Sequence, residues 1–194
     1  VLTDKDLRKG KYGAILAVGE GSQDKPRLVE LVYSPRGAKQ TIALIGKGVT
    51  FDTGGINLKP SGGIEDMKID MSGAAAVAAT LIAVARLKPE VSVAGVIPIV
   101  ENMPSGTATR PGDVIKSYAG KTIEIGNTDA EGRLILIDAM EHALKRFNPD
   151  VMVDIATLTG ACMVALGDKI AGVFSRDDDL ADAIVAAGEK THER

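Results

Sequence analysis

Residues 127–134, Asn-Thr-Asp-Ala-Glu-Gly-Arg-Leu, combine two acidic side chains and a guanidinium within one short segment. Asp129 and Glu131 stand at alternate positions of an extended or turning segment, so their carboxylates can converge on one cation. Arg133 follows two residues later and is always charged, so it can hold an anionic group beside them. The segment therefore indicates metal and anion chemistry, although such a cluster alone is also typical of a solvated acidic turn.

A second charged cluster lies in a glycine-rich segment, residues 46–71. Its glycines permit positive φ and close backbone approach, so a loop can fold tightly around a small charged ligand. The apolar run Thr41–Gly46 is typical of a buried strand that carries Lys47 at its carboxyl end. Open α/β sheets bind ligands at that edge. The charged residues of the segment are Lys47, Asp52, Lys59, Glu65, Asp66, Lys68 and Asp70. We expect Glu65 and Asp66 to be solvated.

Together the two segments resemble the leucine aminopeptidase family, also called cytosol aminopeptidases. The string NTDAEGRL is similar to the family signature, and GKGVTFDTGG, NLKP, MKIDMSGAAAV and ATLTG are similar to its other blocks, in the family's order. The resemblance covers nearly the whole chain but only part of a family member. It implies that residues 1–194 are a partial catalytic metallopeptidase domain with a zinc-exopeptidase-like fold, truncated at its C-terminal end and lacking the family's N-terminal domain.

The resemblance also implies a site for two divalent metal ions per subunit, manganese or zinc. Asp52 and Glu131 would bridge the ions, and Asp129 would complete the more exchangeable position. Lys47 and Asp70 would complete the tighter one. Lys47 must lose its proton to act as a ligand, because an ammonium group has no lone pair. The alternative is an ordinary surface lysine, but a place after a predicted buried strand and between two glycines favours the ligand role.

Catalytic and substrate-binding roles follow from the same resemblance. The family's lysine at the position of Lys59 stabilises the oxyanion, which suits a positive charge placed where negative charge develops. The arginine matching Arg133 holds a bicarbonate that carries a proton to the leaving amine, which suits its planar fork. Four more residues match positions around the substrate: Met67, Thr157, Leu158 and Gly160. Without the resemblance, Met67 would be interpreted as core packing.

The implied function is removal of N-terminal residues from peptides, preferably apolar ones such as leucine, by a cytoplasmic homo-hexamer. Two alternatives stay open. Another two-metal hydrolase would use Arg133 to hold a substrate phosphate. An inactive fragment would result if residues beyond this segment complete the pocket and the sheet.

Composition excludes several other classes. The net charge of −3 argues against a basic nucleic-acid surface, and we expect no apolar run that approaches the length of a membrane span. Cys162 is the only cysteine, so the chain forms no internal disulfide. The segment Gly120-Lys121-Thr122 lacks the upstream glycine of a phosphate-binding loop. No signal peptide is evident at the start of the sequence.

Strands and helices alternate along the chain, which predicts a three-layer α/β fold with a mostly parallel sheet and helices on both faces. We expect Ser72 to cap a helix. We expect Asp138 and Glu141 to form a solvated helix face or to pair with Lys145. The predicted strands are 11–18, 27–33, 41–46, 91–100, 121–125, 151–156 and 170–175, and the predicted helices are 73–88, 132–147, 161–166 and 177–193.

Overall fold

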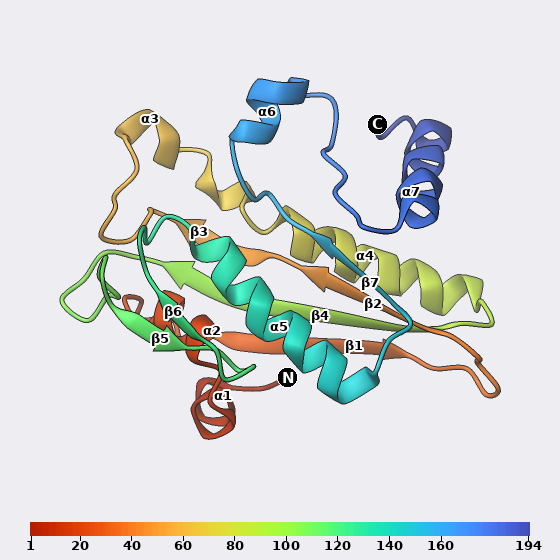
Figure 1. Cartoon of the computed structure of the whole chain (residues 1–194), viewed down its shortest axis with the longest axis horizontal. Coiled ribbons are helices and arrows are strands. Elements are labelled where there is room, and N and C mark those ends of the chain that lie inside the picture. Colours follow the sequence, from red (N-terminus) through yellow and green to blue (C-terminus); the bar gives the residue numbers. More distant parts are fainter. The chain divides into compact units, whose positions relative to one another are not determined.

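Apolar, β-branched runs form the main sheet, because such side chains pack well on a pleated surface. The computed structural model describes residues 1–194, which divide into two units, Val1–Thr157 and Leu158–Arg194. The sheet of the first unit has the order β1-β4-β2-β7, and β3 pairs with β4 beyond the end of β2 (Figure 1). Only β1 runs antiparallel to its neighbour. The strands are β1 (Arg27–Tyr33), β2 (Thr41–Gly46), β3 (Gly48–Asp52), β4 (Ser92–Asn102) and β7 (Val151–Ile155).

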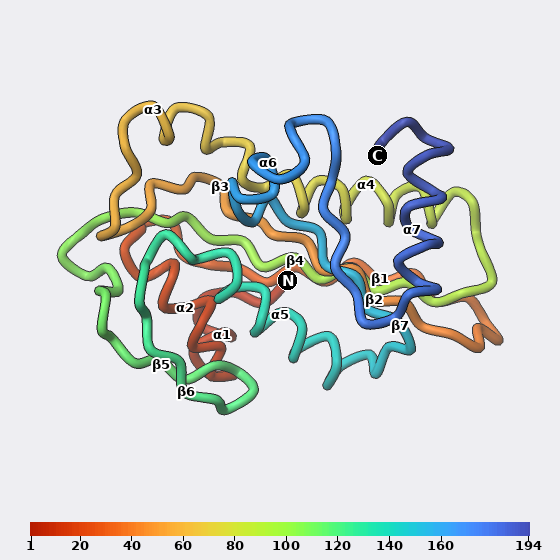
Figure 2. The backbone as a smooth tube through the Cα atoms, turned by 45° about the horizontal axis from the view of Figure 1, so that its top comes forward, coloured from red at the N-terminus to blue at the C-terminus, as the bar shows by residue number.

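Helices cover both faces of this sheet, as predicted. Ala43 and Ile45 of β2 point into the core beneath α1 (Asp4–Gly10), α2 (Gly13–Gly19) and α5 (Glu131–Phe147). Leu44 points the other way, toward the core beneath α4 (Ser72–Leu87). This alternation is the period-two pattern of a strand buried on both faces. A short hairpin of β5 (Val114–Lys116) and β6 (Thr122–Glu124) lies beside α2 (Figure 2).

The prediction of a strand over residues 11–18 is wrong, because Gly13–Gly19 form helix α2. Asp138 Oδ2, which comes from α5, accepts the backbone N–H groups of Ala14 at 2.9 Å and Ile15 at 3.1 Å. These donors lie in the first turn of α2, where no partner exists within the helix. A carboxylate 124 residues from Ala14 in the sequence therefore caps the helix, and a local apolar pattern gives no sign of it.

Asp138 is completely buried, so the prediction that it lies on a solvated face is also wrong. Its second oxygen, Oδ1, accepts the backbone N–H of Tyr118 at 2.7 Å. One side chain thus joins α5 to α2 and to the segment after β5. Glu141 does pair with Lys145, at 3.1 Å, as predicted.

We expect Asp138→Ala to lower the free energy of unfolding by about 2–4 kcal/mol, because two buried N–H groups and one partly buried N–H group would lose their acceptor. Urea denaturation measures this change. Glu141→Ala is the matched control on the same helix, and its exposed ion pair should contribute less than about 1 kcal/mol. Equal losses in the two variants would contradict the capping role of Asp138.

Several element boundaries differ from those predicted. β4 continues to Asn102, two residues beyond its predicted end. Helix α4 begins at Ser72 itself, with Met71 as its N-cap, and Ser72 Oγ donates to the carbonyl oxygen of Ile69 at 2.6 Å. The expected serine cap is therefore absent. The sequence patterns also missed α1, α3 (Ser61–Ile64), β3 and β5.

The second unit contains two helices, α6 (Ala161–Leu166) and α7 (Asp178–Thr191). The side chain of Asp177 accepts the backbone N–H of Leu180 at 3.0 Å, which caps α7. No strand forms over residues 170–175, so that prediction is wrong. The second unit contains no strand with which this short apolar run could pair.

The segment Ser61–Leu87 is long and apolar enough by composition to cross a membrane, which corrects the expectation that no run approaches this length. This is a weak indication, because core helices meet the same criterion. The regular helix α4 within it has 16 residues, fewer than the about 20 that a span needs. Its buried residues Val77 and Leu81 pack on the sheet, and 28% of the apolar window is buried.

Candidate metal centre

Side chains at the carboxyl ends of the parallel strands converge on one region of the first unit. Lys47 directly follows β2, Asp52 ends β3 and Asn102 ends β4. Thr157 lies two residues beyond β7. Glu131, the first residue of α5, reaches the same region. This is the edge at which open α/β sheets bind ligands.

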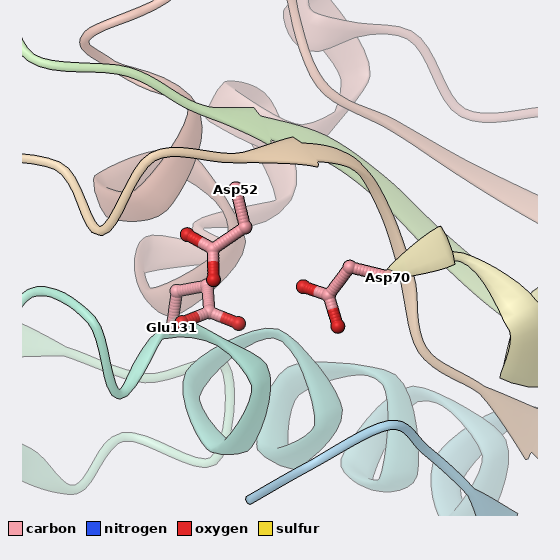
Figure 3. A group of neighbouring side chains, drawn as sticks. All are labelled: Asp52, Asp70 and Glu131. Atoms are coloured by element: carbon pink, nitrogen blue, oxygen red, sulfur yellow. The ribbon is translucent and has the colours of Figure 1, made fainter. Parts of the chain in front are cut away.

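Three buried carboxylates form the centre of this region. Asp52, Asp70 and Glu131 are only 2, 4 and 2% exposed, and one oxygen of each lies within 4.8 Å of the others. Figure 3 shows the three side chains pointing toward one another from the end of β3, the turn before α4 and the start of α5. Buried carboxylates gathered in this way repel one another and require positive charge nearby.

Two lysines supply positive charge from inside the protein. Lys47 Nζ lies 2.8 Å from Asp70 Oδ1 and 2.7 Å from Glu131 Oε1, and it donates to the carbonyl oxygen of Thr157 at 2.9 Å. Lys47 is therefore buried in the centre, and the alternative of an ordinary surface lysine is wrong.

The second lysine connects the buried carboxylates to the loop before α5. Lys59 Nζ lies 3.0 Å from Asp52 Oδ2 and 2.6 Å from Asp129 Oδ1. Asp129 is only partly buried. The six side chains of the cluster thus carry four acidic and two basic groups.

Burial shifts the ionisation of this cluster. It raises the pKa of Glu131 to about 7, although the positive charge of Lys47 opposes the shift. It also raises the pKa of Asp70, against the hydrogen bond from Lys47. Burial lowers the pKa of Lys59, but the hydrogen bonds to Asp129 and Asp52 outweigh this effect and hold it above its ordinary value.

The donor set fits divalent metal ions. Asp70 Oδ2 is buried and has no hydrogen-bond partner, which is costly for a carboxylate oxygen unless a cation contacts it. Asp52 and Glu131 offer further oxygens within reach. Carboxylate oxygens suit hard cations such as manganese, and zinc also accepts them.

The other predicted site residues are placed as follows. Thr157 reaches the centre, because its Oγ1 donates to Asp70 Oδ1 at 2.7 Å. Met67 begins the short 3₁₀ helix η1 (Met67–Ile69) just before Asp70 and is partly buried. Arg133 lies in the first turn of α5 and is exposed. Leu158 and Gly160 belong to the second unit, and their predicted substrate contacts stay predictions. Glu65 and Asp66 are exposed, as expected.

Sequence reasoning missed a set of uncharged residues around the carboxylates. Asn102 donates to Asp52, and Thr128 and Asn57 join the loop before α5 to the glycine turn after β3. In that turn Gly55 has φ +66°, and a Cβ there would lie 2.9 Å from Asn102 Oδ1. The signal that could have revealed Asn102 is its place at the carboxyl end of a predicted strand, but the predicted end fell two residues short.

The α/β fold and its buried acidic centre are the arrangement of a catalytic domain that binds divalent metal ions. The sequence model of the family described as "Cytosol aminopeptidase family, catalytic domain" matches residues 1–194. The chain therefore belongs to this family. A probable cytosol aminopeptidase of Chlorobium limicola is 60% identical over 183 residues, which are 94% of this chain and 36% of that protein. One of Streptomyces avermitilis is 56% identical, over 100% of this chain and 37% of the relative.

The fold has a close counterpart among solved structures. A Caenorhabditis elegans leucine aminopeptidase superposes with a TM-score of 0.96 at 37% sequence identity, covering 99% of this chain and 39% of that one. The chain thus spans less than two fifths of the length of these relatives.

Proposed function

We propose that the chain is part of one catalytic domain of an aminopeptidase that removes N-terminal residues from peptides, with a preference for apolar residues such as leucine. The family membership supports this proposal. The observation that carries it is the buried cluster of Asp52, Asp70 and Glu131 beside Lys47 and Lys59, at the ligand-binding edge of the sheet. Buried charges carry a large desolvation cost, so a cluster of this kind is a poor way to stabilise a core and indicates a functional role.

The proposed cofactors are two divalent ions, manganese or zinc. Asp52 and Glu131 would contact both ions, Asp129 would complete one position, and Lys47 and Asp70 would complete the other. When bound, two such ions lower the pKa of a shared water and polarise the peptide carbonyl. For Lys47 to join the ligands, its Nζ must give up a proton and exchange its ion pairs with Asp70 and Glu131 for a metal bond.

Lys59 and Arg133 are the proposed catalytic residues. The raised pKa of Lys59 keeps its amine protonated. Lys59 can therefore present a positive charge to the oxyanion that develops on the substrate carbonyl. Arg133 is exposed on α5 two residues after Glu131, where its fork can hold a bicarbonate that passes a proton to the leaving amine. Met67, Thr157, Leu158 and Gly160 would contact the substrate side chain and backbone.

Location and assembly are proposed from the family. The relatives are named cytosol aminopeptidases, which supports a cytoplasmic location. We propose a homo-hexamer acting on peptides, with no role for nucleic acid or membrane, and the net charge of −3 is in keeping with the absence of a basic nucleic-acid surface.

Calorimetric titration of the metal-free chain with Mn²⁺ and then Zn²⁺ tests the metal centre. We expect two ions per chain. Hydrolysis of leucine p-nitroanilide by the complete protein, set against a panel of phosphoesters, tests the reaction. Turnover of phosphoesters alone would contradict the aminopeptidase proposal.

The affinity for Mn²⁺ should depend on pH in a defined direction. Because burial raises the pKa of Glu131 to about 7, a proton competes with the cation for this carboxylate below that pH. The affinity should therefore fall by about tenfold for each pH unit below 7, for this one proton, and should stop changing on its account above 7. Calorimetric titrations between about pH 5.5 and pH 8 measure this dependence. An affinity that stays constant across this range would contradict it.

A further inference from the structure

Asn102, the last residue of β4, is an uncharged side chain buried among the proposed metal ligands. We infer that Asn102 is a positioning residue, which fixes the carboxylate of Asp52 and the loop that carries Asp129 and Glu131 relative to each other. The inference rests on the proposed two-metal function and adds a residue to it. No motif in the sequence pointed to this role.

The side-chain amide of Asn102 uses both of its hydrogens in this region. Nδ2 donates to Asp52 Oδ1 at 2.8 Å and to the carbonyl oxygen of Thr128 at 3.1 Å. An amide NH₂ group has two donors, so none is left over. One group thus connects the end of β3 to the loop that runs directly into Asp129.

These contacts give the two oxygens of Asp52 different partners. Oδ1 accepts from Asn102 and also from the backbone N–H of Gly54 at 2.9 Å, whereas Oδ2 lies 3.0 Å from Lys59 Nζ. With Oδ1 held by two donors, the carboxylate cannot rotate freely, and Oδ2 is the oxygen presented to a cation. Outer partners of this kind orient metal ligands and strongly affect metal affinity.

The backbone around Asn102 holds the amide in place. Its carbonyl oxygen accepts from Thr53 N at 3.0 Å and from Thr53 Oγ1 at 2.8 Å. On the other side, Gly55 packs so closely that a Cβ there would lie 2.9 Å from Asn102 Oδ1. The amide is therefore clamped between β4 and the glycine turn, which gives its two hydrogen bonds a fixed direction.

Asn57 offers a matched comparison. The side-chain Oδ1 of Asn57 accepts a hydrogen bond from the backbone N–H of Thr128 at 2.8 Å. The backbone N–H of Asn57 donates to Thr128 Oγ1 at 2.8 Å. Asn57 therefore ties down the same loop as Asn102, but it makes no hydrogen bond to any of the acidic residues proposed as ligands. Substitutions of Asn57 and Asn102 therefore distinguish two effects: loss of order in the loop alone, and loss of the hydrogen bond that holds Asp52.

The test compares Asn102→Ala with Asn57→Ala in the 194-residue chain. We expect Asn102→Ala to weaken Mn²⁺ binding by about tenfold or more in calorimetric titration, because an outer partner of a ligand is lost. Asn57→Ala should change the affinity less than about threefold, well below the loss of such a partner. The visible absorption of bound Co²⁺ gives a second signal, which should change only in Asn102→Ala because it reports ligand geometry. Urea denaturation shows how far each variant is destabilised.

Each outcome has a distinct meaning. Binding and a Co²⁺ spectrum like those of the unmodified chain in Asn102→Ala would overturn the inference, and so would equal losses of affinity in both variants. Failure of the unmodified chain to bind Mn²⁺ would instead contradict the proposed function, and the inference with it. If Asn102→Ala does not fold, Asn102→Leu fills the same space without a donor and is judged by the same two signals.

Discussion

Glu131→Gln is expected to weaken Mn²⁺ binding by more than about 100-fold, beyond the range typical of an outer partner. The substitution keeps the shape of the side chain but removes a negative charge that lies 2.7 Å from Lys47 Nζ, in a site where only 2% of the residue is exposed. A buried charge acts through a low local dielectric, so its loss is felt strongly by a nearby cation. Calorimetric titration of the metal-free chain measures the effect.

The control for this substitution is Glu65→Gln. Glu65 is an exposed acid in the same glycine-rich segment that carries Asp70. Its charge is screened by water and salt, so the change in affinity should stay within about threefold. A Glu131→Gln variant that still binds two Mn²⁺ ions tightly would show that the buried cluster is not the metal centre.

Gly73→Ala is expected to lower the free energy of unfolding by more than about 3 kcal/mol, in the upper range for a point substitution. A Cβ at Gly73 would overlap the carbonyl oxygen of Ile155 in β7. That oxygen accepts a hydrogen bond from the backbone N–H of Lys47 at 3.0 Å. The backbone carbonyl oxygen of Lys47 in turn accepts one from the backbone N–H of Ala74 at 2.9 Å. The overlap is with backbone atoms, so it can be relieved only by moving α4 away from the sheet.

The same movement should weaken metal binding, because Asp70 precedes α4 and the carbonyl oxygen of Lys47 accepts from Ala74 N in the first turn of α4. Urea denaturation and Mn²⁺ titration measure the two effects. Gly62→Ala is the control, within the glycine-rich segment. No atom lies within 4 Å of the position of a Cβ added at Gly62, and Gly62 has no positive φ. Similar stability of the two variants would contradict the close contact between α4 and β7.

The sequence patterns predicted those elements whose apolar residues follow a clear strand or helix pattern. β1 and β2 have the predicted boundaries, and α5 begins one residue early, because apolar periodicity alone determines their faces. The patterns failed where a distant group decides the local structure. Residues 13–19 form a continuous apolar run that is also typical of a strand, yet they form a helix whose first turn is capped by the carboxylate of Asp138.

The charged members of the candidate site were named from the resemblance of the sequence motifs to the leucine aminopeptidase family. The sequence did not predict how these charged residues pair with one another. Nothing in the spacing indicates that Lys47 faces Asp70 and Glu131 while Lys59 faces Asp52 and Asp129. Asn102 was missed because amides carry no charge and occur in many strand ends and turns. Such residues become visible only when the hydrogen bonds they donate are known.

The two lysines of the acidic centre also bear on when the protein acquires its metal. Each brings a counter-charge that is part of the polypeptide, so the four carboxylates can be gathered while the chain is still folding. Many small zinc domains must capture their ion before they fold, because their ligands have no other partner. Here the internal ion pairs allow the framework to form before an ion binds, and metal loading would then be an exchange at an existing site that depends on cation supply and pH.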